Sequence, residues 1–539
     1  MKIRHLIVGL ACYCLTDSVL AQSISPYVSD ALQFSQSQPF GTTRFQSMGG
    51  VNTALGADIS SISGNPAGLG FYRKSDFSIT PSLNFTNNKS TFIGRQLSDG
   101  TTFFNVPNFG IVFSGAKKDT DNSLWRGGSF GISYNRNANF RNVVTFQGNP
   151  NSANSIAVYF RGLADALDLP SSRLDVADDQ IGFNVGYNQA MAQLAYKGYL
   201  IEGYDSDNDG NQDVGNYYIT NLSRNATVDP QTNELIEDPF EVSQSETWTT
   251  TGGRSQWSFA WGGNWADKLY MGVSLGISSI RYESTKGYTE VVNESTLNFL
   301  DQFTVTDNLK VNGTGFNATL GLNYRPVDWV RIGWSFSTPT LYRLNEVSFT
   351  SLSTRVKDPS TVGGNNPIGF RTVDNEFDYN LTTPLRTSVG IAFFFEKYGF
   401  ISGDVEYMPY KGARIGGSDW STDNSGLSER VTINNQIKQT YTNTFNYRVG
   451  GEFRYQIFRI RAGFAYQTDP YQQRIDDLNR SLLSYSGGVG IKLSNFYSDL
   501  GVMYSQSKGG YTPYQLPGAP SATTQYNTTS VMLTIGSSF

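Results

Sequence analysis

The sequence predicts an all-β protein: a transmembrane antiparallel β-barrel of about fourteen strands with an N-terminal plug (hatch) inside its lumen. Three observations predict this fold class. Many segments alternate apolar and polar residues, their connections alternate between short and long, and no window has the eighteen or so apolar residues of a membrane-spanning helix. Such a chain crosses a membrane with strands, because a closed barrel leaves no backbone group unpaired in lipid.

The first residues are typical of a secretory signal, which we place at residues 1–21. Lys2 and Arg4 precede the apolar stretch Leu6–Leu15, and the small residue Ala21 ends the segment. The apolar stretch is too short to span a bilayer. We therefore expect an exported protein, located in the outer membrane of a Gram-negative bacterium.

Both cysteines, Cys12 and Cys14, and the only histidine, His5, fall within this signal. A chain without thiol or imidazole has no Ser-His-Asp triad, no Cys-His pair and no ordinary zinc or haem ligands. We expect no enzyme and no required cofactor, although a paired-carboxylate hydrolase and a tyrosine-ligated haem stay formally open. The net charge of -5 argues against a nucleic-acid partner.

The barrel is expected over residues 71–539, and its pattern is clearest in Leu269–Ile277. Large apolar residues occupy the odd positions of this segment, and Tyr, Gly, Ser and Gly occupy the even ones. One face of the strand is therefore apolar and the other is mostly small and polar. Inward-facing Gly272, Ser274 and Gly276 would leave room for a filling in the lumen.

The connections between these segments alternate in length. The short ones fall at 264–268, 325–329, 396–399, 455–458 and 493–497. The long ones fall roughly at 86–105, 137–246, 284–307, 339–382, 409–438, 468–481 and 506–523. Short turns at one end and long loops at the other are typical of an outer-membrane barrel, whereas a secreted sandwich or propeller does not require this segregation.

The C-terminal segment has the same alternation. Val531, Leu533, Ile535 and the terminal Phe539 lie on one parity. This pattern resembles the signal that the barrel-assembly machinery of the outer membrane reads. We expect that machinery and outer-membrane lipid to be partners of the chain.

Residues 22–70 show no period of two, and we assign them to the plug. Irregular backbone cannot lie in lipid, but polar walls and water inside a barrel can satisfy it. Phe34, Phe40 and Phe45 are its candidate ligand-binding residues. In the Asn65-Pro66 turn, the Asn side chain can cap nearby amides and the proline fixes its own φ, which predicts a rigid turn.

The segment Gly49–Tyr72 (GGVNTALGADISSISGNPAGLGFY) resembles the plug-to-first-strand segment of the FadL/TodX family of outer-membrane transport proteins. Two further stretches are similar in character, Thr314–Leu344 and Tyr447–Pro470. The resemblance implies a fourteen-stranded barrel and an Asn-Pro-Ala hatch motif, here Asn65, Pro66 and Ala67. Gly64 departs from the bulky residue that better-known members often carry before the Asn.

The same resemblance implies passive uptake of hydrophobic molecules, such as long-chain fatty acids or aromatic hydrocarbons. The solute would leave through a gap in the barrel wall made by a kinked strand. The alternation breaks at Ser133–Asn142, which is the candidate for this kink. A β-bulge with no transport role would give the same pattern.

An acidic stretch in the longest loop has the spacing of a calcium loop. Calcium takes oxygen ligands at alternating positions of a tight turn. The candidate ligands are Asp205, Asp207, Asp209, Asn211 and Asp213. The twelfth position is Asn216 rather than Glu, so a structural Ca²⁺ site and a solvated loop tip stay as alternatives.

The same loop contains an expected amphipathic helix at Ser155–Pro170. Its apolar face includes Tyr159 and Phe160, which are also candidates for ligand contact. The face could catch ligand or pack on neighbouring loops. For the whole chain the sequence favours a channel for hydrophobic solutes, gated by the plug; the alternative is a structural or adhesive barrel whose loops bind a surface partner without transport.

Overall fold

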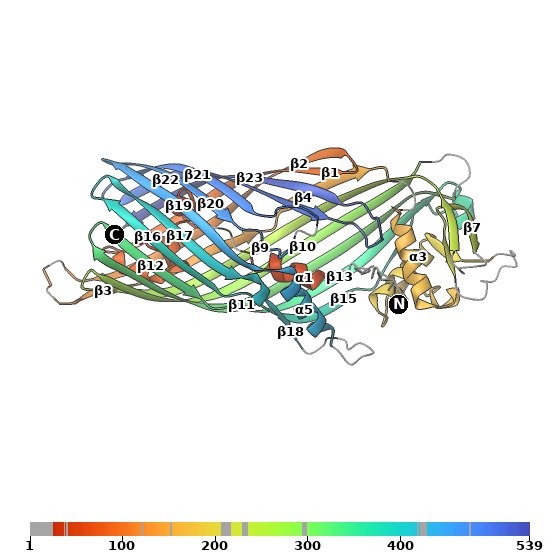
Figure 1. Cartoon of the computed structure of the whole chain (residues 1–539), viewed down its shortest axis with the longest axis horizontal. Helices are drawn as coiled ribbons and strands as arrows, with labels where there is room; N and C mark the ends of the chain where they lie inside the picture. Colours follow the sequence, from red (N-terminus) through yellow and green to blue (C-terminus); the bar gives the residue numbers. More distant parts are fainter. Residues whose placement is uncertain are drawn as a thin grey trace, which may run out of the picture.

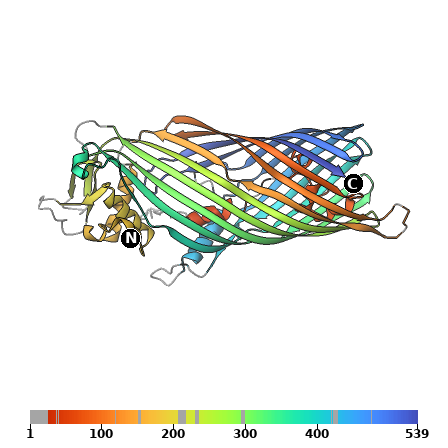
Figure 2. The same ribbon diagram turned by 180° about the vertical axis from the view of Figure 1, so that it is seen from behind.

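The computed structural model describes residues 25–36, 38, 41–118, 120–121, 123–150, 154–205, 217–228, 235–293, 299–417, 420, 428–473 and 476–539. Its main body is a long antiparallel β-barrel with tilted strands. A small outer domain lies beyond one end of the barrel, and the C-terminus lies at the other end (Figures 1 and 2).

The barrel wall has fourteen strands, because four of them are each interrupted once: β3 with β4, β12 with β13, β15 with β16, and β17 with β18. The bounds are β1 Asp76–Phe92, β2 Arg95–Ala116, β3 Trp125–Asn139, β4 Asn142–Gly148, β9 Val242–Trp265, β10 Leu269–Val292, β11 Leu300–Val327, β12 Val330–Ser337, β13 Leu341–Val356, β15 Asn375–Thr382, β16 Arg386–Phe395, β17 Gly399–Pro409, β18 Arg414–Gly416, β19 Asn443–Tyr455, β20 Phe458–Gln467, β21 Leu482–Lys492, β22 Phe496–Tyr511 and β23 Ala522–Ser538. A short strand, β14 (Ile368–Arg371), adds to the outer part of β13.

The first and last wall strands pair and close the barrel. Asp76 is opposite Ser538, and the ladder continues to Thr91 opposite Thr523. Ser75 and Phe539 exchange two further backbone hydrogen bonds, of 2.9 and 3.1 Å. The predicted barrel and its strand number are therefore confirmed. The predicted short turns all lie at the end of the barrel where Ser75 and Phe539 meet.

The apolar parity of the strands faces outward. Val273, Leu275 and Ile277 expose 41%, 61% and 45% of their surface. Ser274 and Ser278, which have the other parity on the same strand, are buried. The same alternation recurs around the wall and gives the barrel an apolar outer surface. A closed barrel with such a surface is a transmembrane barrel of the Gram-negative outer membrane. Among the described helices, none is long and apolar enough to cross a membrane.

Three of the predicted long loops are wrong in part, because the strands continue through them. Residues 86–105 form a hairpin in which β1 and β2 meet at a two-residue turn, Ile93–Gly94, with positive φ at both positions. Strands also continue into 284–307 and 339–382. These outer ends of the hairpins lie beyond the apolar surface, so their residues lose the alternation that marked the rest of each strand.

The outer domain is inserted between β4 and β9 and has its own apolar core. Its elements are α3 (Ile156–Leu167), η4 (Ser171–Arg173), η5 (Asp178–Gln180), α4 (Tyr187–Lys197), β5 (Ile201–Gly203), β6 (Tyr218–Thr220), β7 (Ser223–Val228) and β8 (Leu235–Pro239). Phe160, Leu194 and Tyr218 are buried in this core, together with residues from the ends of β10, β11 and β13. The domain is thus packed onto the long-loop end of the barrel.

Residues 25–36, 38 and 41–72, which precede β1, lie inside the barrel. Its elements are α1 (Pro26–Gln33), α2 (Thr43–Gln46), η1 (Ile59–Ile62) and η2 (Pro66–Phe71). We call residues 41–72 the luminal segment, and residues 25–36 and 38 the N-terminal arm. Two connections at the long-loop end contain further helices, η6 (Pro359–Val362) in one, and η7 (Tyr410–Gly412) and α5 (Glu429–Thr440) in the other.

Candidate functional site in the barrel lumen and wall

The luminal segment lies against a belt of inward-facing glycines. At each of eleven positions on eleven wall strands, a Cβ atom would approach the luminal segment closer than 3.0 Å, a distance that real Cβ atoms essentially never show. We call these eleven residues the glycine belt: Gly110, Gly131, Gly262, Gly272, Gly321, Gly333, Gly390, Gly450, Gly463, Gly488 and Gly501. The absence of side chains at this level lets the irregular backbone of the segment contact the wall directly.

The Asn65-Pro66-Ala67 turn is fixed on both sides. The Asn65 side-chain oxygen accepts a hydrogen bond from Ala67 N (3.1 Å) and so caps η2. Its amide nitrogen donates to Thr53 O (2.6 Å) within the segment and to Leu322 O (3.2 Å) of β11 in the wall. Asn65 is 1% exposed, so these bonds form away from bulk water. The turn therefore joins the luminal segment to the wall.

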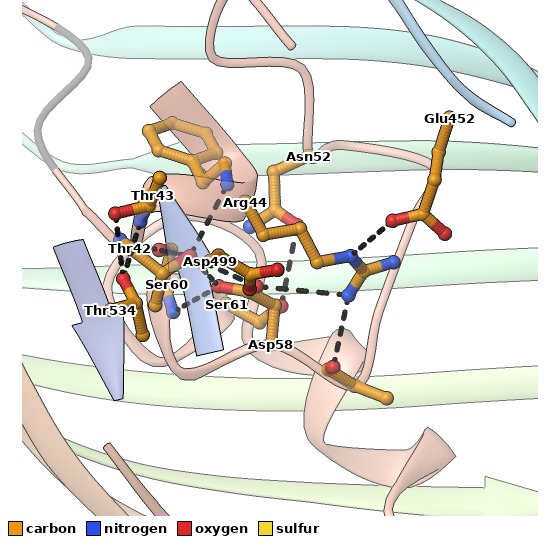
Figure 3. Close-up of polar contacts among 12 residues, drawn as sticks. Thr42, Thr43, Arg44, Asn52, Asp58, Ser60, Ser61, Glu452, Asp499 and Thr534 are labelled. Carbon is orange, nitrogen blue, oxygen red and sulfur yellow. Dashed lines mark hydrogen bonds and ion pairs between the residues drawn. The ribbon is translucent and has the colours of Figure 1, made fainter. Parts of the chain in front are cut away.

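Two charged groups also bind the luminal segment to the wall. One carboxylate oxygen of Asp404 on β17 accepts hydrogen bonds from Asn52 N (2.9 Å), Thr53 N (2.9 Å) and Thr53 Oγ1 (2.8 Å). In the segment, the Arg44 guanidinium lies between Asp58 (3.7 Å) and Glu452 of β19 (3.4 Å; Figure 3). Bonds to charged groups are stronger than neutral ones, so these contacts anchor the segment to β17 and β19 in addition to its bond with β11.

The barrel wall has a gap between β2 and β4. The β2–β3 ladder stops at the pair Asn108–Asn135. Beyond it β3 bulges between Arg136 and Ala138, and the chain resumes at Asn142 as β4, which is paired with β9. Among the described residues, no backbone ladder joins β4 to the outer half of β2. The break that the sequence predicted within Ser133–Asn142 is therefore a real interruption of the wall.

Side chains, rather than a ladder, hold β4 beside β1 and β2. The Asn88 amide of β1 donates to Asn142 Oδ1 (2.6 Å) and to Val143 O (2.7 Å). Asp99 of β2 accepts from Thr145 N (2.7 Å), and Ser90 Oγ donates to Thr145 O. Separation at this place would break these side-chain bonds and leave all the ladders of the barrel intact.

The gap begins at the level of the apolar outer surface and extends outward beyond it, to the side-chain bonds of Asn88, Ser90 and Asp99. Leu83 of β1 and Phe104 of β2 are paired neighbours beside it, and they expose 40% and 67% of their surface. In a bilayer this surface faces acyl chains. An opening between β2 and β4 would therefore connect the lumen with lipid.

Two cavities lie inside the barrel near these elements. The first, of about 100 Å³, is bordered by the luminal segment and by charged wall residues that include Arg386, Asp404 and Arg448. The second, of about 380 Å³, is bordered by the N-terminal arm and by the chain at the gap, Asn139–Asn142, and we call it the gap cavity. Gln38 of the arm lines both cavities, so the arm separates them.

Helix α1 of the arm occupies an apolar chamber in the lumen. Val28, Ala31 and Phe34 are fully buried there among aliphatic and aromatic residues of the wall and of α5. Phe34 contacts the rings of Phe140 and Tyr282 edge-on, with ring centroids 5.8 Å apart in both pairs. Because Phe140 lies in the interruption between β3 and β4, the arm contacts the chain at the gap directly.

Comparisons with known proteins identify the fold of the chain. No family model matches the sequence, and no curated protein matches it significantly. Among solved structures, a FadL homologue from Pseudomonas aeruginosa matches with a TM-score of 0.52 and 11% identity, over 93% of this chain and 99% of that one. The chain has the FadL fold. The toluene transporters TodX of P. putida (TM-score 0.49, 11% identity, 94% of this chain and 99% of that one) and TbuX of Ralstonia pickettii (0.45, 14%, 94% and 100%) also match.

Within this FadL fold, the predicted ligand-binding residues lie in different places. Phe34 is in the apolar chamber and Phe45 lines the smaller cavity. Phe160 is buried in the core of the outer domain, and Tyr159 packs against that core. The structure thus places the helix face of α3 against neighbouring elements of its own domain, and Phe40 lies outside the described residues.

The predicted calcium ligands are mostly outside the described part of the chain. Asp205 is described and half-buried. Asp207, Asp209, Asn211 and Asp213 lie outside the described residues, as do the predicted signal and its cysteines and histidine. The calcium site stays a prediction.

Sequence reasoning missed the residues that seat the luminal segment. Asp404 and Arg44 had one weak signal: each lies in a stretch with few charged residues. The glycine belt had none, because a glycine in a strand also marks bends and bulges. Of the belt only Gly272 was predicted to leave room for a filling, together with Ser274 and Gly276, which lie outside the belt.

Proposed function

We propose that this protein is an outer-membrane channel for passive uptake of hydrophobic solutes. In this proposal the luminal segment is a plug that closes the direct path through the barrel, and Asn65, Pro66 and Ala67 form part of its seat. The solute enters from the long-loop end and leaves laterally, through the gap between β2 and β4.

The gap at the level of the apolar surface carries the proposal. The free energy of a hydrophobic solute falls when it moves from the lumen to acyl chains and rises when it moves to water. A hydrophilic solute would gain nothing from an exit into lipid. A wall that is interrupted beside β2 and β4, and closed there by side-chain bonds of Asn88, Ser90 and Asp99, fits a solute of the first kind.

Two further features support it. The apolar chamber that α1 now occupies offers the surface that a hydrophobic solute needs inside an otherwise polar lumen. The luminal segment contacts wall strands on most sides of the barrel, and its backbone is bonded to the wall at Asn65 and at Asp404. A barrel filled in this way leaves the gap as the shortest route out of the gap cavity.

A reversible cross-link across the gap tests the lateral exit. Cysteines replace Asp99 and Thr145, whose side chain and backbone nitrogen are bonded across the gap (2.7 Å). The native cysteines, Cys12 and Cys14, lie in the predicted signal, so the mature protein would carry only the new pair. Uptake of labelled palmitic acid by cells is measured before and after bridging with a short, reducible thiol reagent.

We expect bridging to abolish uptake and reduction to restore it. The matched control is a cysteine pair at Thr285 and Asn308, which are opposite each other in the β10–β11 ladder away from the gap. Its bridging should leave uptake unchanged. Undiminished uptake with a bridged gap would overturn the lateral exit, and absence of uptake of both palmitic acid and N-dodecanoylglycine by the unaltered protein would favour the structural or adhesive alternative.

A further inference from the structure

The gap cavity is lined by neutral polar groups rather than by hydrocarbon. Of the twenty-one residues that line it, seven are Asn or Gln, six are Ser or Thr, five are aromatic and only two, Leu482 and Met503, are aliphatic. Arg141 is the single charged residue in the lining, which contains no Asp or Glu. The polar residues come from the arm, from β1, from the interruption before β4, and from β9, β22 and β23, so they surround the cavity.

Several of these groups are available to a solute. Gln36 and Gln38 of the arm are exposed to the cavity, and among the hydrogen bonds between described residues none involves their side-chain amides. Covering such groups with a hydrocarbon chain would remove their water without replacing it, which is unfavourable for every amide left unpaired. A solute that brings its own hydrogen-bonding groups avoids this cost.

The remaining lining residues suit an apolar body. Phe103, Phe140 and Trp248 offer flat faces to the same space. The Arg141 guanidinium lies over the Phe103 ring, 5.9 Å from its centroid. Because no acidic residue lines the cavity, nothing there repels a carboxylate.

We infer that the solute of this channel is an amphiphile with hydroxyl, carbonyl or amide groups along an apolar body, uncharged or singly anionic, rather than a plain hydrocarbon or an unsubstituted fatty acid. The inference rests on the proposed function, since it names the solute class for the same route. Such an amphiphile still partitions into lipid through the gap. Inside the cavity its polar groups pair with the amides of the arm and the hydroxyl groups of the wall.

The test compares two acids of equal chain length. N-dodecanoylglycine and pentadecanoic acid both have one carboxylate at the end of a fifteen-atom chain, and they differ by the internal amide. Binding to the full-length protein in amphipol is measured by titration calorimetry. We expect N-dodecanoylglycine to bind about tenfold more tightly, which corresponds to roughly one or two net hydrogen bonds.

Substitutions assign the preference to the arm. In the Gln36→Leu/Gln38→Leu double variant we expect the ratio of the two affinities to fall below about threefold, because the unpaired amides are gone. Gln96→Leu is the matched control, since Gln96 is exposed at the outer tip of the β1–β2 hairpin and does not line the cavity. The control should keep the preference of the unaltered protein.

The outcomes separate this inference from the proposed function. Equal or tighter binding of pentadecanoic acid would overturn the inference, and so would an undiminished preference in the double variant. In either case uptake of pentadecanoic acid by cells that carry the protein would leave the proposed function standing. If cells take up neither acid and the protein binds neither, both the inference and the proposed function are overturned.

Discussion

Replacing Gly272 by alanine tests whether the luminal segment is seated on the glycine belt. A Cβ at this position would lie 2.5 Å from Ala67 N and closer still to the carbonyl group of Pro66. Ordinary contact begins at 3.4 Å, so the hatch turn would have to move by at least about 0.9 Å. Backbone on both sides of the contact leaves no flexible side chain that could yield instead.

The cost of this movement follows from the bonds of the turn. Overpacking strains a close-packed interior by about 1–3 kcal/mol. A displaced turn weakens the three hydrogen bonds of Asn65, to Thr53 O, Leu322 O and Ala67 N, each worth about 1 kcal/mol. Only the destabilisation of the seated state counts, and a value of about 1–3 kcal/mol would raise the population of displaced segments by about fivefold to a hundredfold.

Ion conductance across planar bilayers measures this population. We expect the Gly272→Ala barrel to fold, as judged by its heat-modifiable mobility in gels, and to conduct more than the unaltered protein. Gly287→Ala is the control in the same strand, because nothing lies within 4 Å of a Cβ at Gly287. Normal folding with unchanged conductance in Gly272→Ala, or an equal rise in Gly287→Ala, would refute the seating argument.

Three further results are expected. Asp404→Ala removes the acceptor of three hydrogen bonds from Asn52 and Thr53, each worth about 1.5–3 kcal/mol. Protease added from the short-turn side should then cleave the luminal segment faster. Unchanged cleavage would contradict the role of Asp404 as an anchor of this segment. Phe34→Ala leaves a cavity in the apolar chamber at a cost of about 3–5 kcal/mol, so amide hydrogen exchange in α1 should accelerate while exchange in the wall does not. In the outer domain, burial raises the pKa of Asp165 to about 6, so folding disfavours its ionised form. The domain should be most stable below about pH 4 and lose stability as pH rises to about 6; Asp165→Asn, which can still accept from Tyr218 N, should flatten this part of the profile of thermal midpoints, measured by near-ultraviolet circular dichroism.

The membrane-spanning part of the barrel could be predicted from the sequence because lipid imposes a strict pattern. A strand with lipid on one side must present an apolar side chain at every second position, as Val273, Leu275 and Ile277 do. Beyond the membrane that requirement ends. In the outer hairpin of β1 and β2 even the buried inner face carries polar residues such as Asn88 and Ser90, so Thr86–Thr102 shows no alternation of apolar and polar residues and was taken for a loop.

The candidate site could be predicted only where chemistry is local. The Asn65-Pro66 turn was recognisable because its cap is made two residues away, by Ala67 N. The partners of Asp404 are more than 350 residues distant in the chain, and a spacing of that kind leaves no signal in one sequence. The arm was assigned to the predicted plug, but its helix was not predicted, because α1 has eight residues, too few for its apolar face to be told from chance.

The earliest and latest parts of the chain meet in the wall of the finished molecule. Thr43 N donates to Thr534 Oγ1 (2.7 Å), and Thr534 in turn donates to Thr43 Oγ1 (2.9 Å; Figure 3). Thr534 lies on β23, whose pairing with β1 is the seam of the cylinder. A residue of the strand that closes the cylinder therefore also binds the luminal segment, so closure of the wall completes the site that holds this segment.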